Sequence, residues 1–532
     1  MAKKLLIAGS ALALICSCNS MENPLLTESS APFGAPEFDK IKNEHYLPAF
    51  EAGIAEAKAE IDAIVANKEE PTFENTIEAM EVSGQTLNNV AGIFFNLMEA
   101  DTDDEMQQIA ESVSPMLTEY SMYVSLNNDL FQRVKAVYEK KDELGLAPDQ
   151  MKLLEDNYKS FVRGGANLSD EDKALYSKWS EELSLTTLQF SKNVLAATNA
   201  YVLNITDSTK LGGLPGFVKT MAAETAAEKG LEGWAFTLDA PSYSPFLKYS
   251  TERELRKEIW TAYNTRAIGG ENDNTEIVKK IVDLRIKIAN ILGYETYADY
   301  ALEERMAKNK VTVNEFIKNL LEPSMEFAKK DVADVLAFAK KNGFEESQLM
   351  PWDFSFWSEK YQQAEYSLSA EELKPYFQLE SCIDAVFGLA TRLYGITFKQ
   401  LDNVPVYHED VKVYEVNDAD GRHLALFYAD FFPRASKRGG AWMTEFRGQS
   451  IRDGVEYRPF ISTVMNFTKP TADAPALITH DELTTFLHEF GHALHGIFAE
   501  GRYGSLTGTN VSRDFVELPS QIMENWAFEP EY

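Results

Sequence analysis

The sequence of 532 residues has few cysteines and no long apolar run, and each shortage excludes a class of protein. Of its three cysteines, Cys16 and Cys18 lie close to the N-terminus, and only Cys382 lies in the body of the chain. A framework of internal disulfides is therefore excluded, and Cys382, within an apolar helical run, is expected to be a buried structural thiol. No stretch after the N-terminal region is long and apolar enough to form a membrane-spanning helix.

Basic residues are scarce relative to acidic ones. The chain has 51 lysines and arginines against 83 aspartates and glutamates, which gives a formal net charge of −32. This charge argues against nucleic acid as a partner and against electrostatic binding to anionic lipid. An acidic surface favours cationic peptides, although solubility explains the same composition equally well.

The N-terminus has the pattern of a secretion signal. A short basic region precedes an apolar stretch over residues 5–15, which is too short to span a bilayer. Cys18 follows a small residue and resembles the lipidation site of a bacterial lipoprotein. We predict a lipoprotein signal peptide over residues 1–18, lipidation at Cys18 and a flexible tether over 19–35; an ordinary cleaved signal is the alternative. The expected location is the bacterial cell envelope outside the cytoplasm, with the membrane reached only through the lipid and its face left open.

Two regions with different periodicities follow. Residues 36–403 carry apolar positions at helical spacing almost throughout, which predicts a helical region. Residues 404–532 begin with a change of pattern, and strands are predicted over 411–416, 424–430 and 461–467. The stretch 417–421 between the first two has the turn chemistry of a hairpin. The expected fold class is mainly α, with a small β element immediately before a long helix.

That helix runs from Thr479 to Phe498 and reads THDELTTFLHEFGHALHGIF. Thr479 and Glu482 form a capping-box start. The apolar residues of the stretch share one side of the helix: Leu483, Phe486, Leu487, Phe490, Leu494 and Ile497. His488 and His492 lie one turn apart on the opposite side, so both imidazoles can bind one divalent metal ion.

Zinc is the metal expected at this pair, because imidazole and carboxylate ligands with one open position suit it. Glu489 can reach a metal-activated water without being a ligand, which is the general-base position of HExxH hydrolases. The alternative is an amphipathic helix with surface histidines. The chain has only 7 histidines, four of them between His480 and His495, so a chance match is on the order of one per cent.

A third protein ligand must come from outside the HEFGH sequence. His495 lies about 10 Å along the helix axis from His488, so we expect it to support the ligands or to contact substrate. The carboxylates that follow are Glu500, Asp514, Glu517, Glu524, Glu529 and Glu531. Glu517 stands where a second helix is predicted to start, near Pro519.

HEFGH followed by RDFVELPSQ and ENW closely resembles the M3 metallopeptidases, which include thimet oligopeptidase, neurolysin, oligopeptidase A and bacterial peptidyl-dipeptidase. The resemblance implies that His488, His492 and Glu517 bind one zinc ion per chain and that Glu489 is the catalytic base. It runs through nearly the whole chain after the signal. Segments such as ALFYADFFPRASKRGGAWM look most like the peptidyl-dipeptidase branch.

The resemblance also implies a fold and an activity. The fold is a two-lobed, neurolysin-like helical one, in which residues 36–403 form most of the walls of a deep channel and 404–532 form the catalytic region. The implied activity is zinc-dependent release of C-terminal dipeptides from oligopeptides by a monomer. Endo-cleavage as in oligopeptidase A, a different zinc hydrolase such as an aminopeptidase, and metal binding without catalysis are the alternatives. Further residues expected to support the ligands or to bind substrate are His495, Tyr503, Asp514, Gln521 and Glu524.

Two further expectations concern the surroundings of the zinc helix. An edge strand of the β element can hold an extended peptide through backbone hydrogen bonds, and bracing of the helix is an equally good interpretation. The sequence ends fifteen residues after Glu517 (532 − 517 = 15), where family members continue with a helical segment that supplies tyrosine and histidine side chains. We therefore expect an incomplete copy that by itself binds zinc weakly, aggregates and hydrolyses peptides poorly.

Overall fold

The computed structural model describes residues 23–367, 370–472 and 474–532. The predicted signal peptide 1–18 and its lipidation site Cys18 lie outside the described residues, as does the first part of the predicted tether. No helix of the described part is long and apolar enough to cross a membrane.

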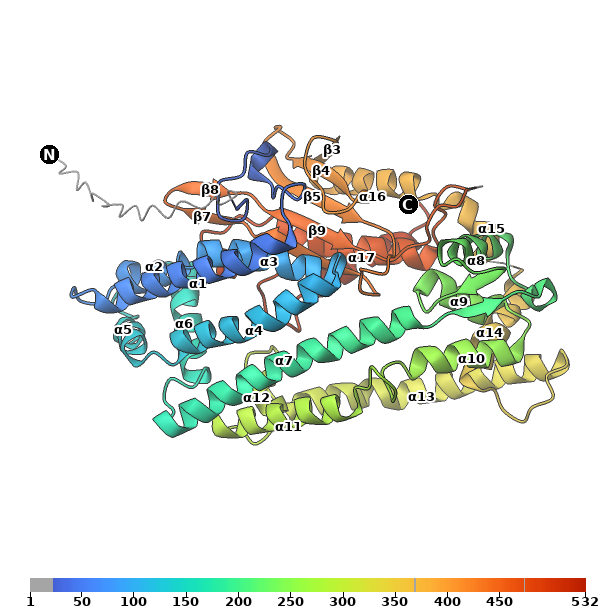
Figure 1. Ribbon diagram of the computed structural model, residues 1–532, viewed down its shortest axis with the longest axis horizontal. Helices are drawn as coiled ribbons and strands as arrows, with labels where there is room; N and C mark the ends of the chain where they lie inside the picture. The colour runs from blue at the N-terminus through green and yellow to red at the C-terminus, as the bar shows by residue number, and fades with distance from the viewer. Residues whose placement is uncertain (1–22, 368–369, 473) are drawn as a thin grey trace.

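The mainly helical fold predicted from periodicity is confirmed (Figure 1). The helices of the first part of the chain are α1 Asn43–Ala66, α2 Ala79–Glu81, α3 Gln85–Ala100, α4 Asp104–Ser125, α5 Asn128–Tyr138, α6 Pro148–Arg163 and α7 Asp170–Ala200. Those of the middle are α8 Gly216–Glu228, α9 Ala240–Tyr249, α10 Arg253–Asn264, α11 Thr275–Ile291, α12 Tyr297–Leu302, α13 Lys310–Lys341, α14 Pro351–Tyr366, α15 Ala370–Leu373 and α16 Leu379–Tyr394. The long helix α7 packs against both α4 and α11. Two short strands, β1 Leu203–Ile205 and β2 Trp234–Phe236, form a small separate pair.

A five-stranded sheet follows, in the order β3-β4-β5-β9-β6. Its strands are β3 Thr397–Leu401, β4 Lys412–Asn417, β5 His423–Asp430, β6 Trp442–Arg447 and β9 Phe460–Val464. The predicted strands are confirmed as β4, β5 and β9, and the hairpin joins the first two. Strand β3 lies before the boundary predicted at residue 404 and pairs with β4, so the sheet begins earlier in the chain than the change of pattern indicated. The edge strand β6 and the ribbon of β7 Ser450–Arg452 and β8 Val455–Tyr457 were not predicted.

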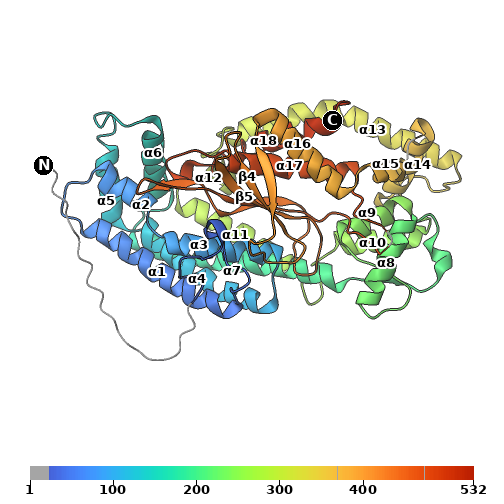
Figure 2. The same cartoon turned by 90° about the horizontal axis from the view of Figure 1, so that it is seen from above.

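Both faces of the central strand β5 are buried. Leu426 and Tyr428 of β5 pack with the apolar side chains of α1, α3 and α4. Ala425 and Phe427, which alternate with them, pack instead against α16 and α17 His480–Ile497. Figure 2 shows β4 and β5 between these two groups of helices. The sheet therefore fixes the position of α17 from one side.

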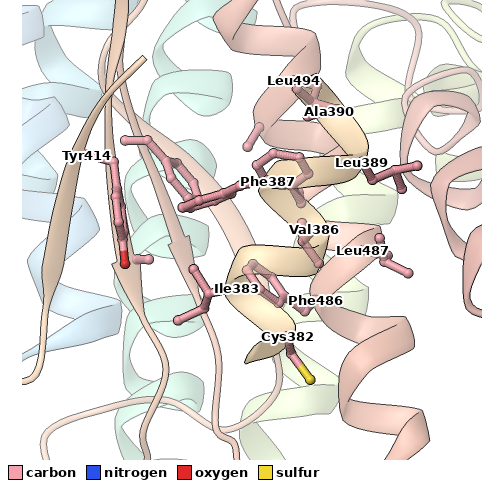
Figure 3. Close-up of a cluster of buried hydrophobic side chains, with 14 of the residues drawn as sticks. Cys382, Ile383, Val386, Phe387, Leu389, Ala390, Tyr414, Phe486, Leu487 and Leu494 are labelled. Atoms are coloured by element: carbon pink, nitrogen blue, oxygen red, sulfur yellow. The ribbon is translucent and has the colours of Figure 1, made fainter. Parts of the chain in front are cut away.

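Helix α16 completes the core around α17 (Figure 3). Ile383, Val386 and Phe387 of α16 belong to the same buried cluster as Phe486 and Leu487 of α17. Cys382 is a buried free thiol, as predicted, and burial raises its pKa to about 11. This thiol is therefore protonated at neutral pH and has a structural role.

The predicted tether over residues 19–35 is wrong for its described part, 23–35. The side-chain amide of Asn23 donates to the carbonyl of His45 at 2.9 Å, and Ala35 is completely buried. The ring of Phe33 stacks on His423 with centroids 4.5 Å apart. The prolines and serines of this segment suggested a linker, but a backbone carbonyl on α1 and a side chain on β5 give it partners that its own composition does not reveal.

Candidate metal centre

Helix α17 begins at the predicted capping box. The hydroxyl of Thr479 accepts a hydrogen bond from the backbone N–H of Glu482 at 3.1 Å, and the Glu482 carboxylate accepts one from the N–H of Thr479 at 2.7 Å. The same carboxylate accepts the N–H of Thr468 at 2.8 Å. This side chain therefore fixes both the start of the helix and the loop that follows β9.

The two sides of α17 differ as the pattern predicted. The apolar side is buried in the core: Leu483, Phe486, Leu487, Phe490, Leu494 and Ile497. His488 and His492 lie on the other side and are partly exposed, with ring centroids 4.9 Å apart. A buried apolar side thus holds two imidazoles at fixed positions one turn apart.

Glu517 joins the two histidines from a separate segment. It directly precedes α18 Leu518–Glu524, the second helix predicted near Pro519. Its Oε2 atom lies 3.2 Å from Nε2 of His488 and 3.1 Å from Nε2 of His492. One ligand atom from each of the three residues lies within 4.8 Å of the others, a group that could hold a metal ion.

Gly491 makes this approach sterically feasible. A Cβ atom at this position would lie 2.5 Å from the carbonyl oxygen of Pro519 and 2.6 Å from Cα of Ser520. Only glycine lets the first turn of α18 lie this close to α17 between the two histidines. Sequence reasoning gave Gly491 no role, because the spacing of HEFGH carries no information about a neighbouring helix.

The hydrogen bonding of His488 tests whether a cation fits between these groups. Its Nδ1 atom lies 2.6 Å from a carboxylate oxygen of Glu524, so Nδ1 is the donor. In a neutral ring, Nε2 then presents a lone pair to the carboxylate oxygen of Glu517, which is unfavourable without a positive charge between them. Two imidazole nitrogens and one carboxylate oxygen are also a zinc donor set, so the residues present fit a metal ion.

Residues 246–532 match the model of peptidase family M3. The chain belongs to this family. It is 40% identical over 514 residues to dipeptidyl carboxypeptidase of Escherichia coli K12, covering 96% of this chain and 75% of the relative. It is 35% identical over 518 residues to oligopeptidase A of the same organism, with the same coverage of both chains.

Among solved structures, a PZ peptidase A bound to an inhibitor aligns with a TM-score of 0.48 and 18% identity, covering 92% of this chain and 70% of that one. The named relatives are peptidases, and the family resemblance predicted from the HEFGH and RDFVELPSQ segments is confirmed. This protein is accordingly a metallopeptidase of family M3.

The carboxyl groups of this M3 peptidase differ in environment. Glu489 is 6% exposed, and its burial raises its pKa to about 7, with Glu517 adding to the rise and His488 opposing it. Burial also opposes ionisation of Glu517, but the hydroxyl of Ser520 and both histidines outweigh it and hold the pKa of Glu517 below its usual value. Burial lowers the pKa of His492. The structure thus combines one ionised carboxylate with one that readily takes up a proton.

The other residues that were predicted to support the ligands or to bind substrate do not all lie at the metal site. Glu524 contacts His488, as described above. His495 lies one turn beyond the histidine pair and burial lowers its pKa, whereas the exposed side chain of Gln521 makes no described hydrogen bond. Asp514 accepts the backbone N–H groups of Met306 and Ala307, both at 2.9 Å, so it fastens the segment before α13 instead of supporting a ligand.

Tyr503 likewise contacts a distant segment. Its hydroxyl donates to Glu78 at 2.6 Å, and its ring packs edge-on against Phe73. The side chain of Tyr503 is buried and does not contact the histidine pair, so in this structure it does not support the ligands. Tyr503 does line a large cavity, which is described below.

Proposed function

We propose that this metallopeptidase is zinc-dependent and releases dipeptides from the C-terminus of oligopeptides. The observation that carries the zinc assignment is the convergence of His488, His492 and Glu517 beside Glu489. The choice of dipeptide release rests on the higher identity to a dipeptidyl carboxypeptidase, 40% against 35% for oligopeptidase A. Endo-cleavage is the second candidate, because the identity to oligopeptidase A extends over the same share of the chain.

The residues of the site have separate roles in the proposed reaction. His488, His492 and Glu517 would hold the zinc ion, which would supply a Lewis acid to polarise water and the scissile carbonyl. Glu524 fixes the ring of His488 by accepting a hydrogen bond from its Nδ1–H. Glu489 takes a proton from the attacking water and returns it to the leaving amine nitrogen. A carbon–oxygen bond forms, the carbon–nitrogen bond breaks, and the carboxylate of Glu489 is regenerated.

The products of peptide cleavage test this proposal. The natural protein, isolated with its metal, is incubated with an N-acetylated hexapeptide and with the same peptide amidated at its C-terminus. We expect the free C-terminal dipeptide as first product from the acid and slower cleavage of the amide, measured by mass spectrometry. Chelation of the metal should abolish both reactions, and added zinc should restore them.

Other products would point to the alternatives. Internal fragments as first products would favour endo-cleavage, and single residues from the N-terminus of an unblocked peptide would indicate an aminopeptidase. Bound zinc without cleavage of any peptide would reject the proposed activity and leave a metal-binding protein.

We also propose attachment to the bacterial cell envelope through lipid on Cys18, which rests on the N-terminal sequence alone. The Cys18→Ser variant should move from the membrane fraction to the soluble fraction in the organism that produces the protein. Immunoblotting of the two fractions measures this. Wild-type protein found wholly in the soluble fraction would contradict the proposal.

A further inference from the structure

A cavity of about 1250 Å³ lies between the N-terminal helices and the strands that follow β5. Residues of α2, α3, α4 and α6 line one side, and β6, the β7–β8 ribbon and residues 502–510 line the other. It is large enough for several residues of an extended peptide. None of the three converging metal-site residues lines it.

Glu445 of the edge strand β6 connects this cavity to α17. The carboxyl group lines the cavity and lies among three glycines. One of its oxygens would lie 2.9 Å from a Cβ atom placed on Gly496 of α17, and 2.9 Å from one placed on Gly508. Its other oxygen would lie 2.9 Å from a Cβ atom on Gly448. The carboxyl group can occupy this space because no side chain projects from these three positions.

The Glu445 carboxyl group has no partner in the part of the chain that the structure describes. No hydrogen bond or ion pair of this group is formed there, and burial alone raises its pKa to about 7. Some other charged groups of the cavity have partners: Arg502 pairs with Glu78 at 2.7 Å, and Glu81 accepts the hydroxyl of Ser505 at 2.7 Å. A partly buried carboxyl group without a donor is costly, and a cation that enters the cavity would remove that cost.

The position of Gly496 relates Glu445 to the catalytic base. Gly496 follows Glu489 by seven residues, so the two lie on the same side of α17 about 10 Å apart along its axis. An extended peptide advances about 3.3 Å per residue. A peptide with its scissile bond at Glu489 that runs along this side of α17 therefore reaches Glu445 about three residues away.

We propose that Glu445 is a specificity-determining residue that binds a cationic nitrogen of the peptide substrate, about three residues from the scissile bond. The nitrogen belongs to a lysine or arginine side chain or to the free N-terminal ammonium of a short peptide. This inference rests on the proposed peptidase function. The excess of acidic residues, with a net charge of −32, attracts the same class of ligand.

Peptide binding tests the inference without turnover. The zinc-loaded protein carries Glu489→Gln, and fluorescence anisotropy gives the Kd of labelled octapeptides in which one lysine is moved through otherwise neutral positions. The reference peptides carry norleucine, which has a similar chain without charge. We expect one position where lysine binds at least about tenfold more tightly than norleucine, because a charged hydrogen bond in a partly buried site contributes this much.

Variants then assign the effect. Glu445→Gln should reduce the lysine-to-norleucine ratio to about one, whereas Glu445→Asp, which keeps the charge, should retain a preference for lysine. The matched control is Asp453→Asn, which removes another carboxylate of the cavity at the turn between β7 and β8 and should keep the full ratio. Circular dichroism spectra establish that each variant is folded.

Acetylation of the peptide N-terminus separates the two sources of the cation. If acetylation abolishes tight binding, the cation that Glu445 binds is the N-terminal ammonium group. If tight binding is retained, the cation is the lysine side chain. Equal binding of lysine and norleucine peptides at every position, acetylated or not, overturns the inference, as does a preference that survives Glu445→Gln. Tighter binding of glutamate peptides would also overturn it and would assign the cavity to Arg447. Failure of the proposed function is seen separately, as absence of hydrolysis by protein with an intact Glu489 that still binds these peptides.

Discussion

Helices α17 and α13 are both amphipathic, but they are buried to very different extents. Ten of the 18 residues of α17 are buried. In α13, which has 32 residues, only Val335 and Ala339 are buried. The large apolar residues of α13 with more than half of their surface exposed are Val311, Phe316, Ile317, Leu320, Leu321 and Phe327.

The neighbours of the two helices account for this difference. Helix α17 lies against the sheet and α18 and shares its core with α16, so its histidines are held on a rigid element. Within the described residues, α13 packs mainly against α14 and, near its start, against α12. An apolar stripe thus predicts that a helix can be buried, but the surrounding elements decide whether it is.

The largest expected difference between the two helices is catalytic. Glu489→Gln on α17 should keep the metal and reduce turnover at least about 100-fold, because the amide cannot accept a proton. Glu326→Gln on α13 makes the same change on an exposed surface and should leave turnover within about twofold. Steady-state kinetics with a dipeptide-releasing substrate, together with zinc content, measures both. Full activity of the zinc-loaded Glu489→Gln variant would refute the role of Glu489.

A second difference concerns packing. Phe490→Ala should destabilise the fold by about 3–5 kcal/mol, since this ring is completely buried against Phe427 and Phe486. Phe327→Ala on α13 should cost less than about 0.5 kcal/mol, because that side chain is 71% exposed. Thermal unfolding compares the two variants. A similar loss for both would show that the exposed side of α13 is covered in solution.

A third change tests the close approach of α18 to α17. Gly491→Ala should weaken zinc binding about 10- to 100-fold, because the added methyl group pushes Glu517 away from the histidines. Gly388→Ala on α16 is the matched control, since no atom outside the adjoining backbone of its own helix lies within 4 Å of its added Cβ. It should leave zinc binding unchanged and stabilise its helix slightly. Competition with a zinc indicator gives both affinities, and unchanged affinity in Gly491→Ala would contradict the packing argument.

The smallest expected effect concerns the pH dependence of stability at the far end of α17. The pKa of Glu445 is about 7 in the folded protein against 4.5 for the free side chain, so the folded state binds more protons between these values. Its contribution to stability is present below pH 4.5 and is lost as the pH rises through 7. The free energy of unfolding of the Glu445→Gln variant, relative to that of the wild type, should therefore rise by on the order of 1–2 kcal/mol between about pH 5 and pH 8. Thermal melting curves of both proteins at pH 5 and at pH 8 measure this change. A difference in stability between variant and wild type that is the same at both pH values would contradict the prediction.

Local patterns in the sequence were enough to predict much of the site. The capping box at Thr479, the apolar side of α17 and the positions of His488 and His492 follow from helical periodicity, which depends only on nearby residues. The strands β4, β5 and β9 followed in the same way from apolar runs. The start of α18 near Pro519 also followed from a local pattern.

Contacts between distant segments needed the tertiary structure. Periodicity left six carboxylates open as a third ligand, and only folding brings Glu517 to the histidines, past a glycine whose role no local pattern shows. The same holds for Glu524 at His488, for Glu445 beside Gly496, and for Asp514, which fastens a segment 207 residues away. The sequence determined which residues could do the chemistry, because residue type and helical spacing are local properties. Their neighbours, and therefore their charge states, depended on which surfaces the packed core brought together.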